Sequence, residues 1–143
     1  MRFMVLVKAN KDSEAGVLPD EKELLEMGKF NDELIKAGVM LAGEGLQASA
    51  KGRRIKLTPG AKPTVTDGPF AETKELLAGF WMVQMKSMDE CVAWFKKCPP
   101  AAGEIEIRQV FDSADFEPVI KTDAGRALLA AEDEFRKRAG KGA

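Results

Sequence analysis

The sequence predicts an α+β fold on the ferredoxin-like βαββαβ plan, with an inserted hairpin and an extra C-terminal helix. Three observations predict it. The 143 residues, of which 45% are hydrophobic, suffice for one domain with its own core. Four segments have the β-branched and aromatic composition of strands, and helical periodicity separates the first pair and the last pair. A hairpin of two short strands lies between the pairs, and its removal leaves the βαββαβ order.

The first strand is predicted over residues 2–9, where the sequence RFMVLVKA is apolar on both faces at its centre. A polar loop over 10–18 follows. A helix is predicted over 20–37, because Asp20 and Glu23 have the spacing of a capping box and a glycine follows the last turn. Its buried stripe is expected to comprise four apolar side chains at helical spacing, Leu24, Met27, Phe30 and Leu34.

The central segments are read as a second strand and a hairpin. Residues 39–48 form the second predicted strand, and its two internal glycines indicate a bulge or a close approach of backbones. Residues 53–58 and 63–67 flank a Pro-Gly turn and predict the hairpin. A loop over 68–76 then leads back to the sheet.

The second half repeats the strand, helix and strand order. Residues 78–85 form a strand, Ser87 and Glu90 mark the start of a helix, and 104–111 alternate as a strand. The apolar stripe of that helix is expected to comprise Cys91, Val92, Phe95 and Cys98. A last helix is predicted from about Asp123 to Ala139.

These elements divide the chain into an α+β domain over residues 1–111 and a connection, helix and basic tail over 112–143. The strands at 2–9 and 78–85 are apolar on both faces, although both helices of this plan cover the same face. We therefore expect a homodimer that packs sheet to sheet. The alternative is that the C-terminal helix folds back over its own sheet.

The composition excludes several chemistries. The chain has no histidine and no tyrosine, which rules out a Ser-His-Asp triad and any His-ligated metal. We expect no metal and no cofactor. The net charge of −1 argues against a nucleic-acid partner, and no apolar run approaches the length of a membrane span. The first apolar stretch is too short for a signal peptide, so a cytoplasmic location is expected. Cys91 and Cys98 are read as small hydrophobic residues in a reducing compartment.

Two segments have the composition of a functional site. The first, residues 66–75, has the sequence TDGPFAETKE, which is also compatible with a tight turn and solvated charges. The second, residues 42–46, has the sequence AGEGL. It places Glu44 between two residues that lack side chains, so its carboxylate is exposed either in a cleft or on the outside of a bulged strand.

Together with Gly79-Phe80, these two segments strongly resemble the DGPF-domain proteins, a branch of the YCII-related family. The match covers about residues 1–111, with the motifs in the expected order and spacing. The resemblance implies a dimeric α+β barrel on the ferredoxin-like plan. Related folds include muconolactone isomerases and a dehydrochlorinase that acts on a chlorinated muconate. Other YCII-like proteins carry a His–Asp pair thought to be catalytic, which this sequence lacks.

Carried over residue by residue, the resemblance places a site in the cleft between the sheet and the loop at 68–76, near the dimer seam. Glu44 and Glu72 are the candidate catalytic bases, since an apolar cleft would raise the pKa of a glutamate. The candidate ligand-binding residues are Asp67, Gly68, Pro69, Phe70 and Lys74, joined by Arg108 from the polar face of the last strand.

Each ligand-binding candidate has a distinct expected role. Gly68 and Pro69 set the turn, and Phe70 anchors the loop or forms a pocket wall. Lys74 would neutralise a bound carboxylate, and Arg108 would hold one in a bidentate manner. The alternative for Arg108 is an ordinary cross-strand pair with a glutamate.

Three functions follow from this reading. The first is the binding of a small, weakly acidic organic ligand, which needs shape and a few polar groups but no histidine. The second is an isomerase, lyase or dehydrochlorinase with a glutamate base. The third is a regulatory partnership with an extracytoplasmic-function sigma factor, because many DGPF proteins are encoded beside one.

Overall fold

The computed structural model describes residues 1–72 and 74–141; Thr73 of the second motif and the last two residues of the tail lie outside this range. The strands are β1 (Arg2–Lys8), β2 (Met40–Gly45), β3 (Arg53–Lys56), β4 (Thr64–Asp67), β5 (Leu77–Gln84) and β6 (Ile105–Gln109). The α-helices are α1 (Lys11–Glu14), α2 (Glu21–Lys36), α3 (Met88–Phe95) and α4 (Asp123–Lys141). The 3-10 helices are η1 (Ser49–Lys51), η2 (Pro100–Ala102) and η3 (Ser113–Val119).

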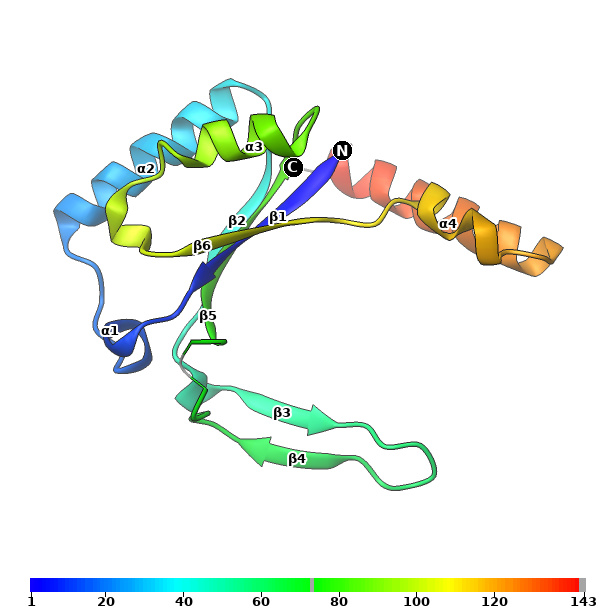
Figure 1. The fold of residues 1–143 in the computed structure, drawn as a ribbon, viewed down its shortest axis with the longest axis horizontal. Helices are drawn as coiled ribbons and strands as arrows, with labels where there is room; N and C mark the ends of the chain where they lie inside the picture. Colours follow the sequence, from blue (N-terminus) through cyan, green and yellow to red (C-terminus); the bar gives the residue numbers. More distant parts are fainter. Residues whose placement is uncertain (73, 142–143) are drawn as a thin grey trace.

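The main sheet has the strand order β2-β5-β1-β6, and each neighbouring pair is antiparallel. Without the hairpin, β1, β2, β5 and β6 are the first to fourth strands of a βαββαβ unit. The predicted α+β, ferredoxin-like fold class is therefore confirmed. Strands β3 and β4 form a separate two-stranded ribbon that projects away from the main sheet (Figure 1).

The core lies between this sheet and the two helices α2 and α3, which cover the same face (Figure 1). Strands β1 and β5 supply alternate side chains to it, and α2 and α3 supply the residues that pack on them. Its buried members are Phe3, Val5, Trp81, Val83, Met85, Phe30, Leu34, Cys91 and Phe95. The rings of Phe30, Trp81 and Phe95 meet edge to face with centroids 5.2 to 6.1 Å apart.

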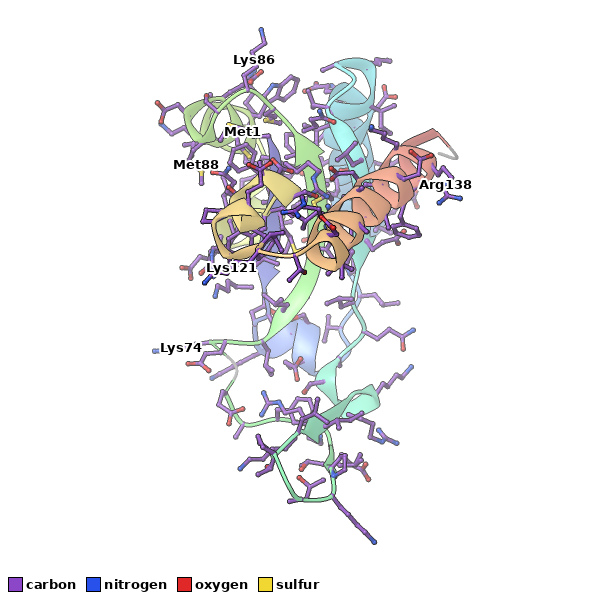
Figure 2. All side chains as sticks on the ribbon, turned by 90° about the vertical axis from the view of Figure 1, so that its right-hand side faces the viewer. Met1, Lys74, Lys86, Met88, Lys121 and Arg138 are labelled. Carbon is purple, nitrogen blue, oxygen red and sulfur yellow. The ribbon has the colours of Figure 1, made fainter. Side chains whose placement is uncertain are left out.

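The opposite face of the sheet is apolar at its centre and half-buried. Cross-strand pairing places Met4 beside Met82 and Leu6 beside Phe80 on this face. The β3–β4 hairpin and α4 both extend on this side of the sheet (Figures 1 and 2). We call these four side chains and their surroundings the open face.

Helix α4 packs mainly on η3. The Ser113 hydroxyl hydrogen-bonds the Asp133 carboxylate, and Arg136 Nη1 donates to Ser113 Oγ at 3.1 Å. The apolar side chains Leu128 and Phe135 of α4 remain 57% and 68% exposed. Helix α4 therefore does not bury its apolar stripe against its own protomer.

Several local expectations need correction. Leu24 is 57% exposed, because the first turns of α2 stand away from the sheet, and Val92 points outward from α3. Strand β2 ends at Gly45 rather than at 48, since the chain turns there toward η1. The Ser87 hydroxyl caps α3 as expected, but the Glu90 carboxylate accepts the N–H of Lys86 and so does not complete the box.

Among the short helices that were not foreseen, α1 and η3 fall in segments expected to be irregular. Helix α1 lies within the expected loop, where the side chains of Asn10 and Ser13 each accept the other residue's backbone N–H at 2.9 Å. The 3-10 helix η3 lies within the expected connection. Both are too short to produce an apolar period in the sequence.

Among the described residues, no helix is long and apolar enough to cross a membrane.

Candidate functional site

The loop after β4 is fixed by close backbone packing. The Gly68–Pro69 peptide bond is cis, and the Gly68 N–H donates to the Gly52 carbonyl at 3.1 Å. A Cβ atom on residue 68 would lie 1.7 Å from the backbone oxygen of Ser49, so only glycine fits. Gly68 and Pro69 thus shape the turn.

Hydrogen bonds through Ser49 hold this loop to the N-terminal part of the chain. The Phe70 N–H donates to Ser49 Oγ at 3.1 Å. The Glu14 carboxylate in turn accepts Ser49 N–H at 3.1 Å and Ser49 Oγ–H at 2.5 Å. No sequence pattern points to Glu14 or Ser49, because 35 residues separate them and neither belongs to a motif.

The two acidic candidates near the loop are paired with hairpin arginines. Asp67 Oδ1 lies 2.8 Å from Arg53 Nε, and Glu72 Oε2 lies 3.1 Å from Arg54 Nη1. The Arg54 guanidinium also stacks 3.9 Å above the Phe70 ring, which lines a shallow hollow with Glu14 and Ser49. Phe70 therefore forms a wall of that hollow.

The pKa of Glu72 is lowered from its ordinary value. A hydrogen bond with its own backbone is the largest cause, and the hydrogen bond and charge of Arg54 follow. This direction is the opposite of the raised pKa expected for a catalytic base, because the carboxylate is exposed and paired rather than enclosed in an apolar cleft. Lys74 is exposed on the same loop.

The remaining two candidates lie on opposite edges of the open face. Glu44 on β2 is opposite Phe80, and Arg108 on β6 is opposite Met4. Strands β5 and β1 separate β2 from β6, so three strand spacings, roughly 14 Å, lie between them. Arg108 Nη1 lies 3.4 Å from Glu106 Oε2 on its own strand, rather than across strands.

Glu106 is the common partner on that edge. Its carboxylate lies 3.5 Å from Lys8 Nζ as well as beside Arg108. The hydrogen bond from Arg108 and the charge of Lys8 lower the pKa of Glu106. The eight candidate residues are thus distributed over the hairpin base and two edges of the sheet within one protomer.

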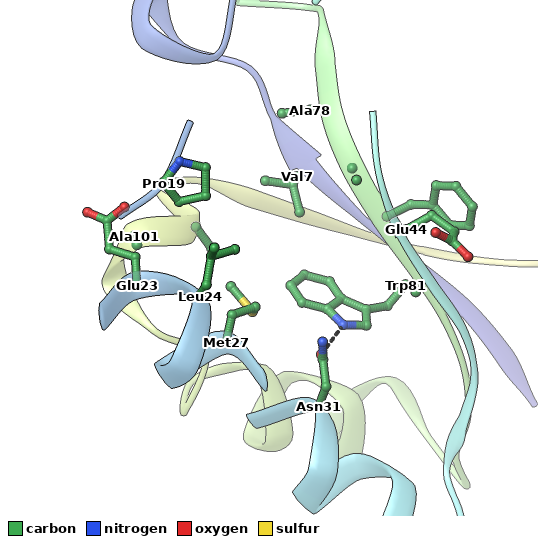
Figure 3. A pocket seen from close by; sticks show the side chains of 15 residues that line it. Val7, Pro19, Glu23, Leu24, Met27, Asn31, Glu44, Ala78, Trp81 and Ala101 are labelled. Atoms are coloured by element: carbon green, nitrogen blue, oxygen red, sulfur yellow. Dashed lines mark hydrogen bonds between the residues drawn. The ribbon is translucent and has the colours of Figure 1, made fainter. Parts of the chain in front are cut away.

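A cavity lies on the other side of the sheet, under the first half of α2 (Figure 3). Its volume is about 320 Å³. The apolar walls are formed by Val7, Pro19, Leu24, Met27 and Trp81. Three glycines, Gly43, Gly45 and Gly79, line the adjoining backbone of β2 and β5. A Cβ atom at Gly45 would meet nothing within 4 Å, whereas a Cβ at Gly43 would lie 2.6 Å from Met40 Cε and one at Gly79 would lie 2.9 Å from the Glu44 carbonyl oxygen.

Glu44 also borders this cavity, but its side chain belongs to the other face of β2. The register places it on the face of Phe80, whereas Gly43 is opposite Trp81. Figure 3 shows its carboxylate directed away from the Trp81 indole. Of the expected site residues, Glu44 is therefore the one that borders both the cavity and the open face.

One polar interaction lies inside the cavity wall. Trp81 Nε1 donates a hydrogen bond to Asn31 Oδ1 at 2.8 Å (Figure 3). Trp81 occupies a core position, with an exposed fraction of 5%. Asn31 was missed, since a single asparagine in an amphipathic helix has no distinguishing pattern.

These features define a small ferredoxin-like domain with a cavity between helix and sheet. The model of the YCII-related domain matches residues 1–114, so the chain belongs to the YCII-related family. It is 28% identical to an uncharacterised protein of Rhizobium meliloti (strain 1021), R00369, over 92 residues, which are 62% of this chain and 73% of that protein.

A solved structure is also similar to this chain. It is the 5-chloro-2-hydroxyhydroquinone dehydrochlorinase of Burkholderia phenoliruptrix AC1100 in complex with 2,5-dihydroxybenzoquinone. The sequence identity is 14% and the TM-score is 0.43, over 78% of this chain and 95% of that one.

Proposed function

We propose that this YCII-related protein binds a small, planar, uncharged organic molecule in the cavity between α2 and the sheet. The cavity itself is the observation that carries the proposal. It is lined by apolar side chains and one indole ring, and the open space at Gly45 leaves room for a ligand. Such a concave, apolar space with few polar groups is typical of ligand sites.

The volume indicates the size of the ligand. A cavity of roughly 150 Å³ accepts one benzene ring. The 320 Å³ present here thus accommodates about two fused rings, or one ring with substituents. The edge of the Trp81 indole and the chains of Leu24 and Met27 provide the apolar contacts for it.

The charges around the cavity favour an uncharged ligand over the weakly acidic one expected from the sequence. The two ionisable residues along the described lining are Glu23 and Glu44, and both are acidic. Glu23 is also engaged in capping α2, where its carboxylate accepts the Asp20 N–H at 3.3 Å. The basic candidates lie elsewhere, with Lys74 on the loop and Arg108 on the far edge of the sheet.

The indole N–H resonance of Trp81 in a ¹H–¹⁵N NMR spectrum tests the proposal. Trp94→Phe assigns the two indole signals. We expect coumarin, a neutral bicyclic compound, to shift the Trp81 signal in a saturable manner, and coumarin-3-carboxylate to bind more weakly.

A cavity-filling variant provides the decisive comparison. A side chain at Gly45 has no atom within 4 Å to clash with, so Gly45→Leu fills the cavity and should abolish the coumarin shift. Gly28→Leu is the matched control, since Gly28 also has open space and lies on the outer side of α2. An unchanged coumarin response in Gly45→Leu would refute the proposed site.

We also propose that the open face packs against a second copy of the chain. Support comes from the half-buried apolar side chains of Met4, Leu6, Phe80 and Met82 at its centre. A contiguous apolar surface of this kind is typical of an interface. Leu6→Glu should convert a dimer into a monomer in native mass spectrometry, whereas Leu25→Glu on the exposed side of α2 should not. A wild-type mass of one chain would overturn this assignment.

The glutamate-base enzyme and the sigma-factor partner remain predictions from the sequence. Glu44 is the residue on which the first depends, because it alone among the candidate bases borders the cavity. Co-purification with a sigma factor tests the second.

A further inference from the structure

The hydrogen bond between Trp81 and Asn31 fixes the orientation of the asparagine amide. An indole N–H is only a donor, so the atom that receives it at 2.8 Å must be the amide oxygen of Asn31. The amide nitrogen Nδ2 consequently occupies the other branch of the same planar group. Trp81 is 5% exposed and packs edge to face with Phe30 and Phe95, so the indole is a rigid reference for this orientation.

The amide nitrogen has hydrogen-bonding capacity to spare. Among the described residues, no hydrogen bond from Asn31 Nδ2 is formed, although Asn31 lines the cavity. Every buried side-chain nitrogen or oxygen of the described part of the chain has a partner. The two N–H groups of Nδ2 are therefore accessible rather than sealed in the core.

We infer that Asn31 determines the ligand specificity of this cavity by donating a hydrogen bond from Nδ2 to an uncharged oxygen acceptor, such as a carbonyl, on a planar ring. The inference rests on the proposed ligand binding in the same cavity. Trp81 acts as a positioning residue, since it holds the amide through Oδ1. The neighbouring side chains of Val7, Leu24 and Met27 are apolar and offer the ligand no competing hydrogen bond.

The physical basis of the selectivity is the free-energy cost of leaving a hydrogen-bond donor without an acceptor. A ligand without an acceptor would displace water from Nδ2 and leave the donor unpaired, whereas a carbonyl-bearing ligand of the same shape would restore the bond. A single neutral hydrogen bond of this kind corresponds to about a fivefold to tenfold difference in affinity. A carboxylate would make the same bond, but the acidic residue Glu23 lies along the same lining and no basic residue does.

The experiment compares coumarin with naphthalene, which has two fused rings but no acceptor. Both are titrated into the wild-type chain and into Asn31→Asp by NMR at pH 7. The aspartate keeps an acceptor for the Trp81 N–H but replaces the Nδ2 donor with an oxygen. We expect Asn31→Asp to weaken coumarin binding by about fivefold to tenfold and to change naphthalene binding by less than about twofold.

The wild-type spectrum provides a second measurement that does not depend on the variant folding. Coumarin should shift the side-chain NH₂ signals of Asn31 downfield, and naphthalene should not. Equal responses of these signals to both probes would overturn the role of Asn31 while leaving the cavity as a ligand site. Failure of both probes to bind, or their undiminished binding to Gly45→Leu, would instead refute the proposed function itself.

Discussion

The substitution Gly68→Ala tests whether the loop after β4 is a structural anchor. A Cβ atom at this position would lie 1.7 Å from the Ser49 oxygen and 2.6 Å from its carbonyl carbon. Both are backbone atoms, so the clash cannot be relieved by a side-chain rotation. The loop must instead move away from η1 by more than 1 Å to reach an ordinary contact distance.

The expected cost follows from the contacts that this movement breaks. Overpacking of this kind costs about 1 to 3 kcal/mol. Two hydrogen bonds lie next to the clash, from Gly68 N–H to the Gly52 carbonyl and from Phe70 N–H to Ser49 Oγ, and each contributes about 1 kcal/mol. The free energy of unfolding should therefore fall by about 3 to 5 kcal/mol, unless the hairpin detaches locally at a lower cost.

Urea unfolding and amide hydrogen exchange distinguish these two outcomes. Global destabilisation lowers the urea midpoint, whereas local detachment leaves the midpoint nearly unchanged and removes protection at Gly68 and Phe70. Gly28→Ala is the control, since no atom lies within 4 Å of the added methyl group and alanine favours a helix by up to about 1 kcal/mol. If Gly68→Ala kept both the wild-type urea midpoint and the wild-type protection at Gly68 and Phe70, the reasoning would be refuted.

Three other perturbations test separate parts of the structure. Glu14→Gln keeps one acceptor for Ser49 but removes the charge, so hydrogen exchange at Phe70 N–H should accelerate while that of β1 stays slow; equal exchange rates would show that the anchor does not depend on this carboxylate. Leu34→Ala removes a side chain with 0% exposure and should cost about 2 to 5 kcal/mol in urea unfolding, with Ile35→Ala as the exposed control. Burial raises the pKa of the Cys91 and Cys98 thiols from 9.0 to about 11. The thiols of the unfolded chain therefore lose their protons at a lower pH than the thiols of the folded chain. This contribution to thermal stability should be fully present below pH 9 and should fall as the pH rises toward 11. The double variant Cys91→Ala/Cys98→Ala should flatten that decline.

The fold was predictable because it depends on patterns that are local in the sequence. The apolar composition of β1 and β5, the alternation in β6 and the cap at Asp20 specify elements whose pairing order follows from short connections. The turn at Gly68 was predictable for the same reason, since the residues that require it are consecutive. Leu24 shows the limit of such patterns. Helical spacing predicts the face of α2 on which Leu24 lies, but it does not predict how far that part of α2 is from the sheet.

The candidate site was less predictable because its contacts join distant parts of the chain. The Glu14–Ser49 contact spans 35 residues and the Asn31–Trp81 contact spans 50. Neither pair has a spacing that a motif records. The acidic residues of the DGPF motif were visible, but their arginine partners on β3 depend on the hairpin register, which pairs Arg53 with Asp67. That register decides which arginine each carboxylate meets.

The two glycines of β2 connect the predicted pattern with the observed cavity. An internal glycine in a strand indicates a close approach, and a Cβ on Gly43 would indeed lie 2.6 Å from Met40 Cε and 3.0 Å from Trp81 Cδ1. Gly43 is therefore needed for the indole to stand where it meets Asn31. Gly45 also lines the cavity but has open space instead, so a side chain there would meet no neighbouring atom. The same strand presents Glu44 to the opposite face, and the alternation of β2 thus separates the surface proposed for association from the cavity proposed for the ligand.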